Sequence, residues 1–189
     1  MIEDALKLTT YFGELHRAEH GLVADALLDL YGQHAVHASV LLRGVEGFGL
    51  KHHLSTDGLE SLSYDLPLVS VAVDTRARID AILPHVIAIK RHGLITLERA
   101  RMLTGDIGPV ALPEDPDEQT KVTIYVGRQE KIVNTPAFIT ICDLLYSRGI
   151  AGATVLLGVD GTFHGQRERA RFFGRNANVP LMIIAVGAG

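Results

Sequence analysis

Hydrophobic residues in the first half of the chain follow two spacings, and each spacing predicts one kind of element. Residues 6–12 are rich in Leu, Thr, Tyr and Phe and predict a strand. An i, i+3, i+4, i+7 spacing over residues 21–31 predicts a helix, with one apolar face formed by Val23, Ala26, Leu27 and Leu30. Short apolar runs predict further strands at 38–42, 66–73 and 94–102.

A second helix is expected after the third strand. Its apolar stripe includes Ile79 and Leu83, and Asp74 stands where it can cap the first turn. Pro84 lies inside the stripe and predicts a kink, or a division of the helix at Leu83, because proline lacks a backbone N–H. The order β-α-β-β-α-β predicts an α+β, ferredoxin-like fold with an antiparallel sheet and helices on one face.

The chain also repeats itself. Residues 7–13 return at 121–127 with Lys, Thr, Tyr and Gly at the same four places. Residues 38–47 align with 153–161 when one residue is omitted. The helical stripe of the first copy returns as Phe138, Ile141, Cys142 and Leu145. We therefore predict a tandem of a complete copy at 1–103, an acidic, proline-containing linker at 104–119, and an incomplete β-α-β-β copy at 120–189.

Glycines are expected to end the helices of both copies. Gly32 and Gly149 follow the two helical stripes, and glycine readily takes the left-handed conformation found there.

Composition narrows the class of protein. The net charge is −4 and there is no basic stripe, which argues against nucleic-acid binding. The single cysteine, Cys142, excludes an internal disulfide and is expected to be a small buried residue. We see no signal peptide and no apolar run of about 18 residues, so a cytoplasmic protein is expected. Small copies of this kind favour an oligomer.

Several motifs resemble the DUF190 family. They are the Lys-Leu-Thr-x-Tyr-x-Gly-Glu run at 7–14, the Arg-Gly-x-x-Gly-Phe-Gly run at 43–49, the Leu-Pro-Leu-Val run at 66–69, and the segment 149–158. This family is similar in fold to PII signalling proteins. The resemblance implies a homo-oligomer, most simply a trimer, with ligand clefts between subunits. It also implies a flexible loop, here 46–65, that binds an adenine nucleotide at its base and contacts a partner such as a membrane transporter or channel.

The candidate ligand site is glycine-rich and basic. Glycines allow backbone N–H groups to approach an anion, and Arg and Lys add charge-assisted hydrogen bonds to phosphate. The predicted ligand-binding residues are Arg43, Gly44, Glu46, Gly47, Gly49, Lys51 and Arg101. The nucleotide site of PII proteins has two arginines in this region. Arg101 matches the first, but this chain has Leu103 in place of the second.

Two alternatives remain open. His52 and His53 lie in the long loop, and His34 and His37 stand three apart, so a metal-responsive protein of the same fold is one alternative. Adjacent histidines in an extended segment point to opposite sides, however, and no cysteine or carboxylate cluster accompanies them. An enzyme acting in an intersubunit cleft is the other, although we find no convincing catalytic set. The leading hypothesis is a PII-like signalling protein that binds a small anion.

Overall fold

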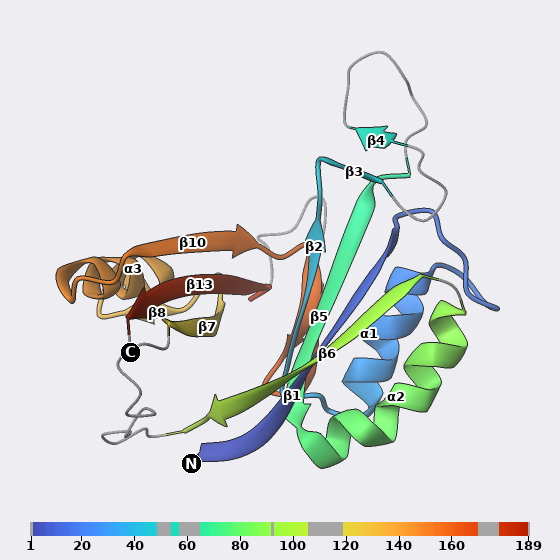
Figure 1. Ribbon diagram of the computed structural model, residues 1–189, viewed down its shortest axis with the longest axis horizontal. Coiled ribbons are helices and arrows are strands. Elements are labelled where there is room, and N and C mark those ends of the chain that lie inside the picture. Colours follow the sequence, from blue (N-terminus) through green and yellow to red (C-terminus); the bar gives the residue numbers. More distant parts are fainter. Residues whose placement is uncertain are drawn as a thin grey trace.

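The first copy has the predicted ferredoxin-like topology (Figure 1). The computed structural model describes residues 2–48, 54–56, 65–91, 93–105, 119–169 and 178–188. The first copy's elements are β1 (Ile2–Gly13), α1 (Val23–Gln33), β2 (Ala38–Arg43), β5 (Pro67–Thr75), α2 (Arg76–Lys90) and β6 (Leu94–Leu103). Its strands follow the order β2-β5-β1-β6, and every neighbouring pair is antiparallel. Both helices cover the same face of this sheet (Figure 1).

The second copy repeats only part of this unit. Its main elements are β7 (Gln119–Gly127), α3 (Ala137–Ser147), β10 (Gly152–Leu157) and β13 (Pro180–Ala188), with the short strands β8 (Lys131–Ile132) and β9 (Thr135–Pro136) before the helix. The sheet order β10-β13-β7 matches β2-β5-β1 of the first copy. Within the described residues no element corresponds to α2 or β6, and the repeat predicted from the sequence is confirmed.

Each copy carries a hairpin between its second and third main strands. The first hairpin is β3 (Glu46–Phe48) with β4 (Leu54–Thr56), and the second is β11 (Asp160–Phe163) with β12 (Gln166–Arg169). The second hairpin joins the first copy, because β11 pairs with β2 and extends the sheet to β12-β11-β2-β5-β1-β6. The sequence did not predict that the hairpin of the second copy would join the sheet of the first.

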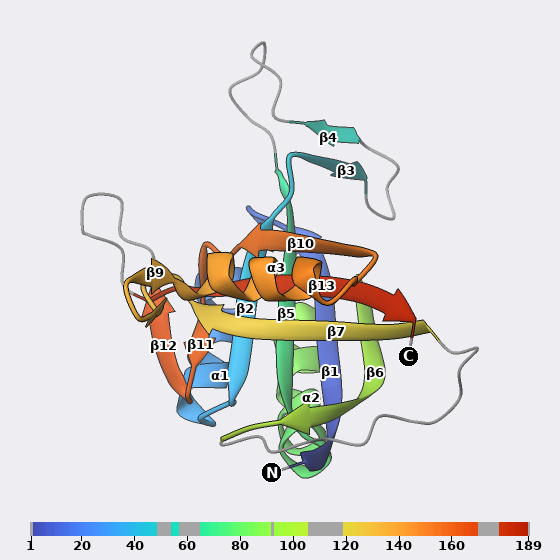
Figure 2. The same ribbon diagram turned by 90° about the vertical axis from the view of Figure 1, so that its left-hand side faces the viewer.

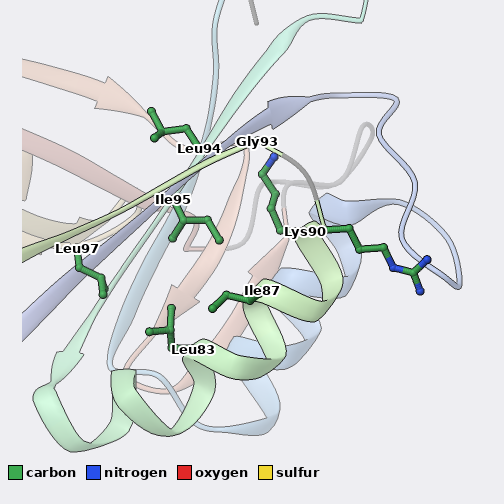
Figure 3. A pocket seen from close by; sticks show the side chains of 8 residues that line it. Leu83, Ile87, Lys90, Gly93, Leu94, Ile95 and Leu97 are labelled. Atoms are coloured by element: carbon green, nitrogen blue, oxygen red, sulfur yellow. The ribbon is translucent and has the colours of Figure 1, made fainter. Parts of the chain in front are cut away.

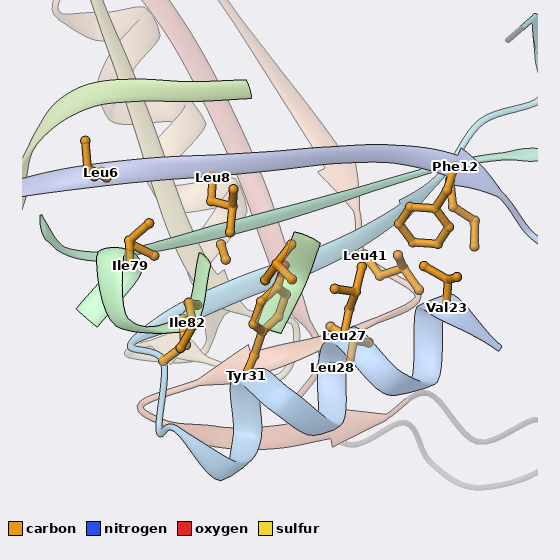
Figure 4. Packing of buried hydrophobic residues seen from close by; sticks show 14 residues of the cluster. Leu6, Leu8, Phe12, Val23, Leu27, Leu28, Tyr31, Leu41, Ile79 and Ile82 are labelled. Carbon is orange, nitrogen blue, oxygen red and sulfur yellow. The ribbon is translucent and has the colours of Figure 1, made fainter. Parts of the chain in front are cut away.

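The two sheets pack against each other, and the helices lie outside. Under α1 and α2 the core includes Leu8, Leu27 and Ile79 (Figure 4). The opposite face of the first sheet presents Val40 and Val71 to Met182 of β13. Strands of the second sheet run across those of the first (Figure 2), and α3 covers the outer face of the second sheet.

The structural alignment of the copies differs by one residue from the sequence alignment. Pro67 and Pro180 begin equivalent strands, so the pair Leu42↔Val69 corresponds to Leu156↔Met182. The buried helical positions agree, because Leu27 and Leu28 correspond to Ile141 and Cys142. Matching identical residues at 38 and 153 was therefore wrong, since a one-residue shift would turn every side chain of β10 to the opposite face.

Local expectations for the helices also need correction. The helix α2 runs through Pro84 and is not divided at Leu83. Thr75, rather than Asp74, is its N-cap residue. The Asp74 carboxylate instead accepts hydrogen bonds from the backbone N–H of His37 at 2.8 Å and of Thr75 at 2.7 Å, which ties the start of β2 to the end of β5.

Of the two glycines predicted to end a helix, only Gly149 does so. Gly149 has φ of +75° as expected. Gly32 lies inside α1, which continues to Gln33, and Ala35 takes the positive φ of 47° instead. Ala35 and Gly149 are equivalent in the structural alignment, so the same turn follows both helices.

Glu98 on β6 connects the two copies through a lysine from each. Its carboxylate accepts hydrogen bonds from Nζ of Lys7 at 2.7 Å and from Nζ of Lys121 at 3.4 Å. These lysines occupy the same position in the repeat. The hydrogen bond from Lys7 lowers the pKa of Glu98 below its ordinary value of 4.5, against the opposing effect of burial.

Replacing Glu98 with glutamine is expected to make the protein less sensitive to acid. A carboxylate whose pKa falls on folding stabilises the native state above its unfolded pKa, and this contribution is lost as the pH falls through the folded value. Below about pH 4.5, wild type should therefore lose stability more steeply than Glu98→Gln. At pH 7 the difference should stay under about 1 kcal/mol, because the pair is partly exposed. Urea midpoints from pH 7 to pH 3 test this, with Glu19→Gln as the control; parallel curves for wild type and Glu98→Gln would contradict it.

Candidate functional site

Arg43 lies at the base of the long loop, at the end of β2. Its Nη2 atom donates a hydrogen bond to Oε2 of Glu14 at 2.9 Å, which connects β2 to the end of β1. The next residue, Gly44, donates its N–H to the carbonyl of Pro67 at 2.8 Å. The chain of Glu46 and Gly47 then enters β3. The predicted ligand residues Gly49 and Lys51 lie outside the described residues.

Asp65 holds the returning end of the loop against the same region. Its Oδ1 atom accepts a hydrogen bond from the N–H of Leu15 at 2.6 Å, and its Oδ2 atom lies 3.4 Å from Nε2 of His16. A Cβ at Gly13 would come within 2.0 Å of Asp65 Oδ2, so a larger residue here would displace this carboxylate. Both ends of the loop are therefore tied to the connection between β1 and α1.

Arg101 does not join Arg43 within this chain. The antiparallel pairing of β1 and β6 places Leu94 beside Tyr11 at the loop end, and Arg101 beside Asp4 at the opposite end. Arg101 is seven residue steps along β6 from Leu94, or roughly 23 Å at about 3.3 Å per step. Arg99 and Arg101 are both exposed on this edge strand.

A cationic residue that the sequence analysis missed lies at the loop end instead. Lys90 is the last residue of α2 and is only 6% exposed. Its Nζ atom lies 5.6 Å from the centroid of the Phe12 ring, and a Cβ at Gly93 would come within 2.2 Å of it. Burial lowers the pKa of Lys90. The signal that could have found this residue is the basic run Lys90-Arg91 at a helix end, followed closely by glycine.

Lys90 lines a cavity of about 480 Å³ between α2 and the edge strand β6 (Figure 3). Apolar side chains form most of the wall, and the two basic residues stand at one end. The lining residues are Leu83, Ile87, Lys90, Arg91, Gly93, Leu94, Ile95 and Leu97. This volume falls within the usual range for small-molecule sites. Such a cavity suits a ligand that combines an apolar part with an anionic part.

The described histidines do not form a metal site. His37 and His164 approach edge to face with 5.9 Å between ring centroids, and His34 lies 5.9 Å from His85. No group of three or more His, Cys, Asp or Glu side chains suited to a metal ion occurs among the described residues. His52 and His53 lie outside this part of the chain. Cys142 lies on α3 and is half-buried rather than fully buried as expected, and it packs against the core of the second copy.

These features define a tandem ferredoxin-like protein with a mostly apolar cavity that includes two basic residues, Lys90 and Arg91. The chain belongs to the DUF190 family, described as "Uncharacterized ACR", whose model matches residues 5–102 and 119–189. A crystal structure described as a candidate glycine cleavage system transcriptional repressor aligns with 100% of this chain and 81% of its own, at 10% identity and a TM-score of 0.27. This TM-score is too low to support any inference about function. None of the described helices has the length and apolar character needed to cross a membrane.

Proposed function

We propose that this chain is a PII-like regulatory protein that binds a small anionic ligand, most simply an adenine nucleotide, and signals through the loop 46–65. The observation that carries the proposal is the cavity between α2 and β6, whose mostly apolar lining also includes two basic residues, Lys90 and Arg91. Basic side chains beside an apolar surface suit a ligand that carries an anionic group. Membership of the DUF190 family and the ferredoxin-like topology support the same function.

The cavity fits the two halves of a nucleotide. Phosphate would bind Lys90 and Arg91 at the basic end, and an adenine ring would pack against apolar side chains such as Leu83 and Ile95. Lys90 contacts the ring of Phe12 near the end of β1, and β1 leads to Glu14, the partner of Arg43. A ligand bound by Lys90 would act on the Arg43–Glu14 pair through β1 and so shift the population of loop conformations.

The assembly and the partner are part of the same proposal. The PII-like resemblance implies a homo-oligomer, most simply a trimer, and a partner protein such as a membrane transporter or channel that reads the loop. Within one chain, Arg101 lies at the end of β6 that is far from the base of the loop. In this proposal, Arg101 therefore enters the ligand site only from a neighbouring chain.

Nucleotide is expected to slow hydrogen exchange in the loop 46–65 and in the α2–β6 connection. The experiment adds ATP, ADP, AMP or a cyclic dinucleotide in turn and measures exchange peptide by peptide. Lys90→Met should abolish the protection while keeping the fold, because methionine retains the apolar stem and removes a poorly solvated charge. Arg76→Ala, at the opposite end of the same helix and 63% exposed in its side chain, is the matched control.

A second pair of variants locates the site. Arg43→Ala should weaken the protection of the loop, since it removes the cation at its base. Loss of protection in Arg101→Ala would show that the site lies between chains. Unchanged exchange with every nucleotide would count against the proposal; tight stoichiometric metal binding would then favour the metal-responsive alternative, and turnover of a ligand would favour an enzyme.

A further inference from the structure

The second hairpin shows how one copy binds another in this fold. Strand β11 adds to the edge of β2 with the register Asp160↔Leu41, Gly161↔Val40, Thr162↔Ser39 and Phe163↔Ala38. The contact begins with the N–H of Val159, which donates to the carbonyl of Leu41 at 2.8 Å. It continues with Oγ1 of Thr162, which lies 2.9 Å from Oγ of Ser39.

Close approach of the two strands depends on Gly161. A Cβ at this residue would lie 2.2 Å from the carbonyl oxygen of Ser39 and 2.5 Å from Cγ of Pro180. Arg167 of β12 then fastens the hairpin to α1 through Asp25 and Asp29. The interface therefore combines strand pairing, an obligatory glycine and an ionic clamp.

The reciprocal contact is open in this chain. The first hairpin forms a separate two-stranded sheet, β3-β4, and β10 is an edge strand of its own sheet. Both ribbon views show β3 and β4 standing clear of β10 (Figures 1 and 2). Gly152, Ala153 and Thr154 of β10 are exposed. Val45, just before β3, is 72% exposed, whereas its equivalent in the paired hairpin, Val159, is 38% exposed.

The structural alignment of the copies gives the residues of this open contact. Position by position, the first hairpin matches the second and β10 matches β2: Glu46 with Asp160, Gly47 with Gly161, Phe48 with Thr162, Val155 with Leu41, Thr154 with Val40, and Ala153 with Ser39. The first hairpin thus has glycine at the position where the second hairpin needs one. Where Thr162 and Ser39 pair through their hydroxyls, the first hairpin and β10 have Phe48 and Ala153, residues without a hydroxyl.

We propose that β3 of one chain adds to the free edge of β10 in a second copy of this chain. The register is Glu46↔Val155, Gly47↔Thr154 and Phe48↔Ala153, by equivalence with the intrachain contact. Each chain then donates one hairpin and accepts one, a head-to-tail contact that can close into a ring. The inference goes beyond the proposed ligand function and requires no ligand. It assigns β3 to assembly and leaves the rest of the loop outside the contact.

Disulfide cross-linking between two different single-cysteine chains tests the register. One chain carries Phe48→Cys and the other Ala153→Cys, both with Cys142→Ala. The equivalent side chains of Thr162 and Ser39 meet within the chain. Residues that pair across antiparallel strands have Cα atoms about 4.5 to 5.5 Å apart, which suits a disulfide. Mixing the two chains under mild oxidation should give a covalent two-chain product that thiol reduction releases, and neither chain alone should give it.

Two matched controls accompany the cross-link. Ser39→Cys with Thr162→Cys in a single chain should form an intrachain disulfide, which shows that the geometry permits the bond. Thr154→Cys in place of Ala153→Cys points to the opposite face of β10 and should not cross-link to Phe48→Cys. The proposed register is wrong if the Ser39→Cys, Thr162→Cys control forms its disulfide but the mixture of Phe48→Cys and Ala153→Cys chains forms none.

A proline scan of the β10 edge tests the pairing without cysteine. In the first copy, the backbone of Ser39 and Leu41 faces β11, so Ala153 and Val155 face the free edge of β10. Ala153→Pro therefore removes an outward N–H and leaves the pairing with β13 intact. Light scattering should show at least a tenfold rise in the dissociation constant for Ala153→Pro and none for Ala153→Ser. A monomeric wild type at micromolar concentration, or an Ala153→Pro assembly unchanged in size, would overturn the proposal.

Discussion

Replacing Arg167 with methionine is expected to lower the free energy of unfolding by about 3 kcal/mol, because breaking a buried ion pair leaves an uncompensated charge. The guanidinium lies 2.7 Å from Asp160 Oδ2 and 3.2 Å from Asp25 Oδ1, and it also contacts Asp29. Burial alone would lower the pKa of Arg167, but the hydrogen bond and charge of Asp160, with Asp25 and Asp29, outweigh it and raise the pKa. Methionine would leave these three carboxylates facing one another.

Controls for this prediction separate charge from packing. Arg167→Lys keeps the charge but cannot reach several carboxylates with a planar fork, so its loss should be intermediate. Arg148→Met, exposed after the end of α3, should have little effect. A double variant, Arg167→Met with Asp160→Asn, should recover part of the stability, because the buried charge is removed with its partner. Urea unfolding at pH 7 measures the stability of all four variants. If Arg167→Met unfolds at the same urea concentration as wild type, the ion pairs of Arg167 do not stabilise the hairpin.

Leu27→Ala is expected to destabilise the protein by about 2 to 5 kcal/mol, the usual cost of deleting a buried leucine side chain. Leu27 is 0% exposed and packs in the core between α1 and the first sheet (Figure 4). The surrounding side chains include Leu8 and Phe12 of β1, which cannot move into the space without disturbing the paired strands. Urea or thermal unfolding measures the loss.

The matched control for this change is Leu144→Ala on α3. Leu144 is 54% exposed, so its removal should cost much less than the removal of Leu27. Similar losses for both variants would contradict the assignment of the buried face of α1.

The order of elements was predictable because local patterns dictate it. Residues 6–12 are rich in Leu, Thr, Tyr and Phe, which favour a strand, and the stripe that includes Leu27 can bury one face only as a helix. The repeat then predicted the second copy. Errors arose where a single residue carried the inference: Pro84 was accepted inside α2, and Gly32 did not end α1.

The candidate site was predicted in part. The glycine-rich run after Arg43 does lead into the loop, and the Arg43–Glu14 pair lies at its base. Arg101 could not be placed from sequence, since only the pairing of β1 with β6 shows that it lies at the other end of the sheet. Lys90 was missed because its place on α2 fits an ordinary basic helix end; its burial depends on Phe12 and on the close approach of Gly93.

The sequence by itself determined the elements, their order within each copy and the presence of a shortened repeat, because these follow from hydrophobic spacing and self-similarity. Tertiary structure alone decided how the copies are joined. The hairpin β11–β12 binds β2 of the other copy through hydrogen bonds between backbone groups, which every residue except proline can make and which therefore leave little trace in the sequence. The one-residue difference in alignment has the same origin, since strand register is set by pairing across the sheet and not by residue identity.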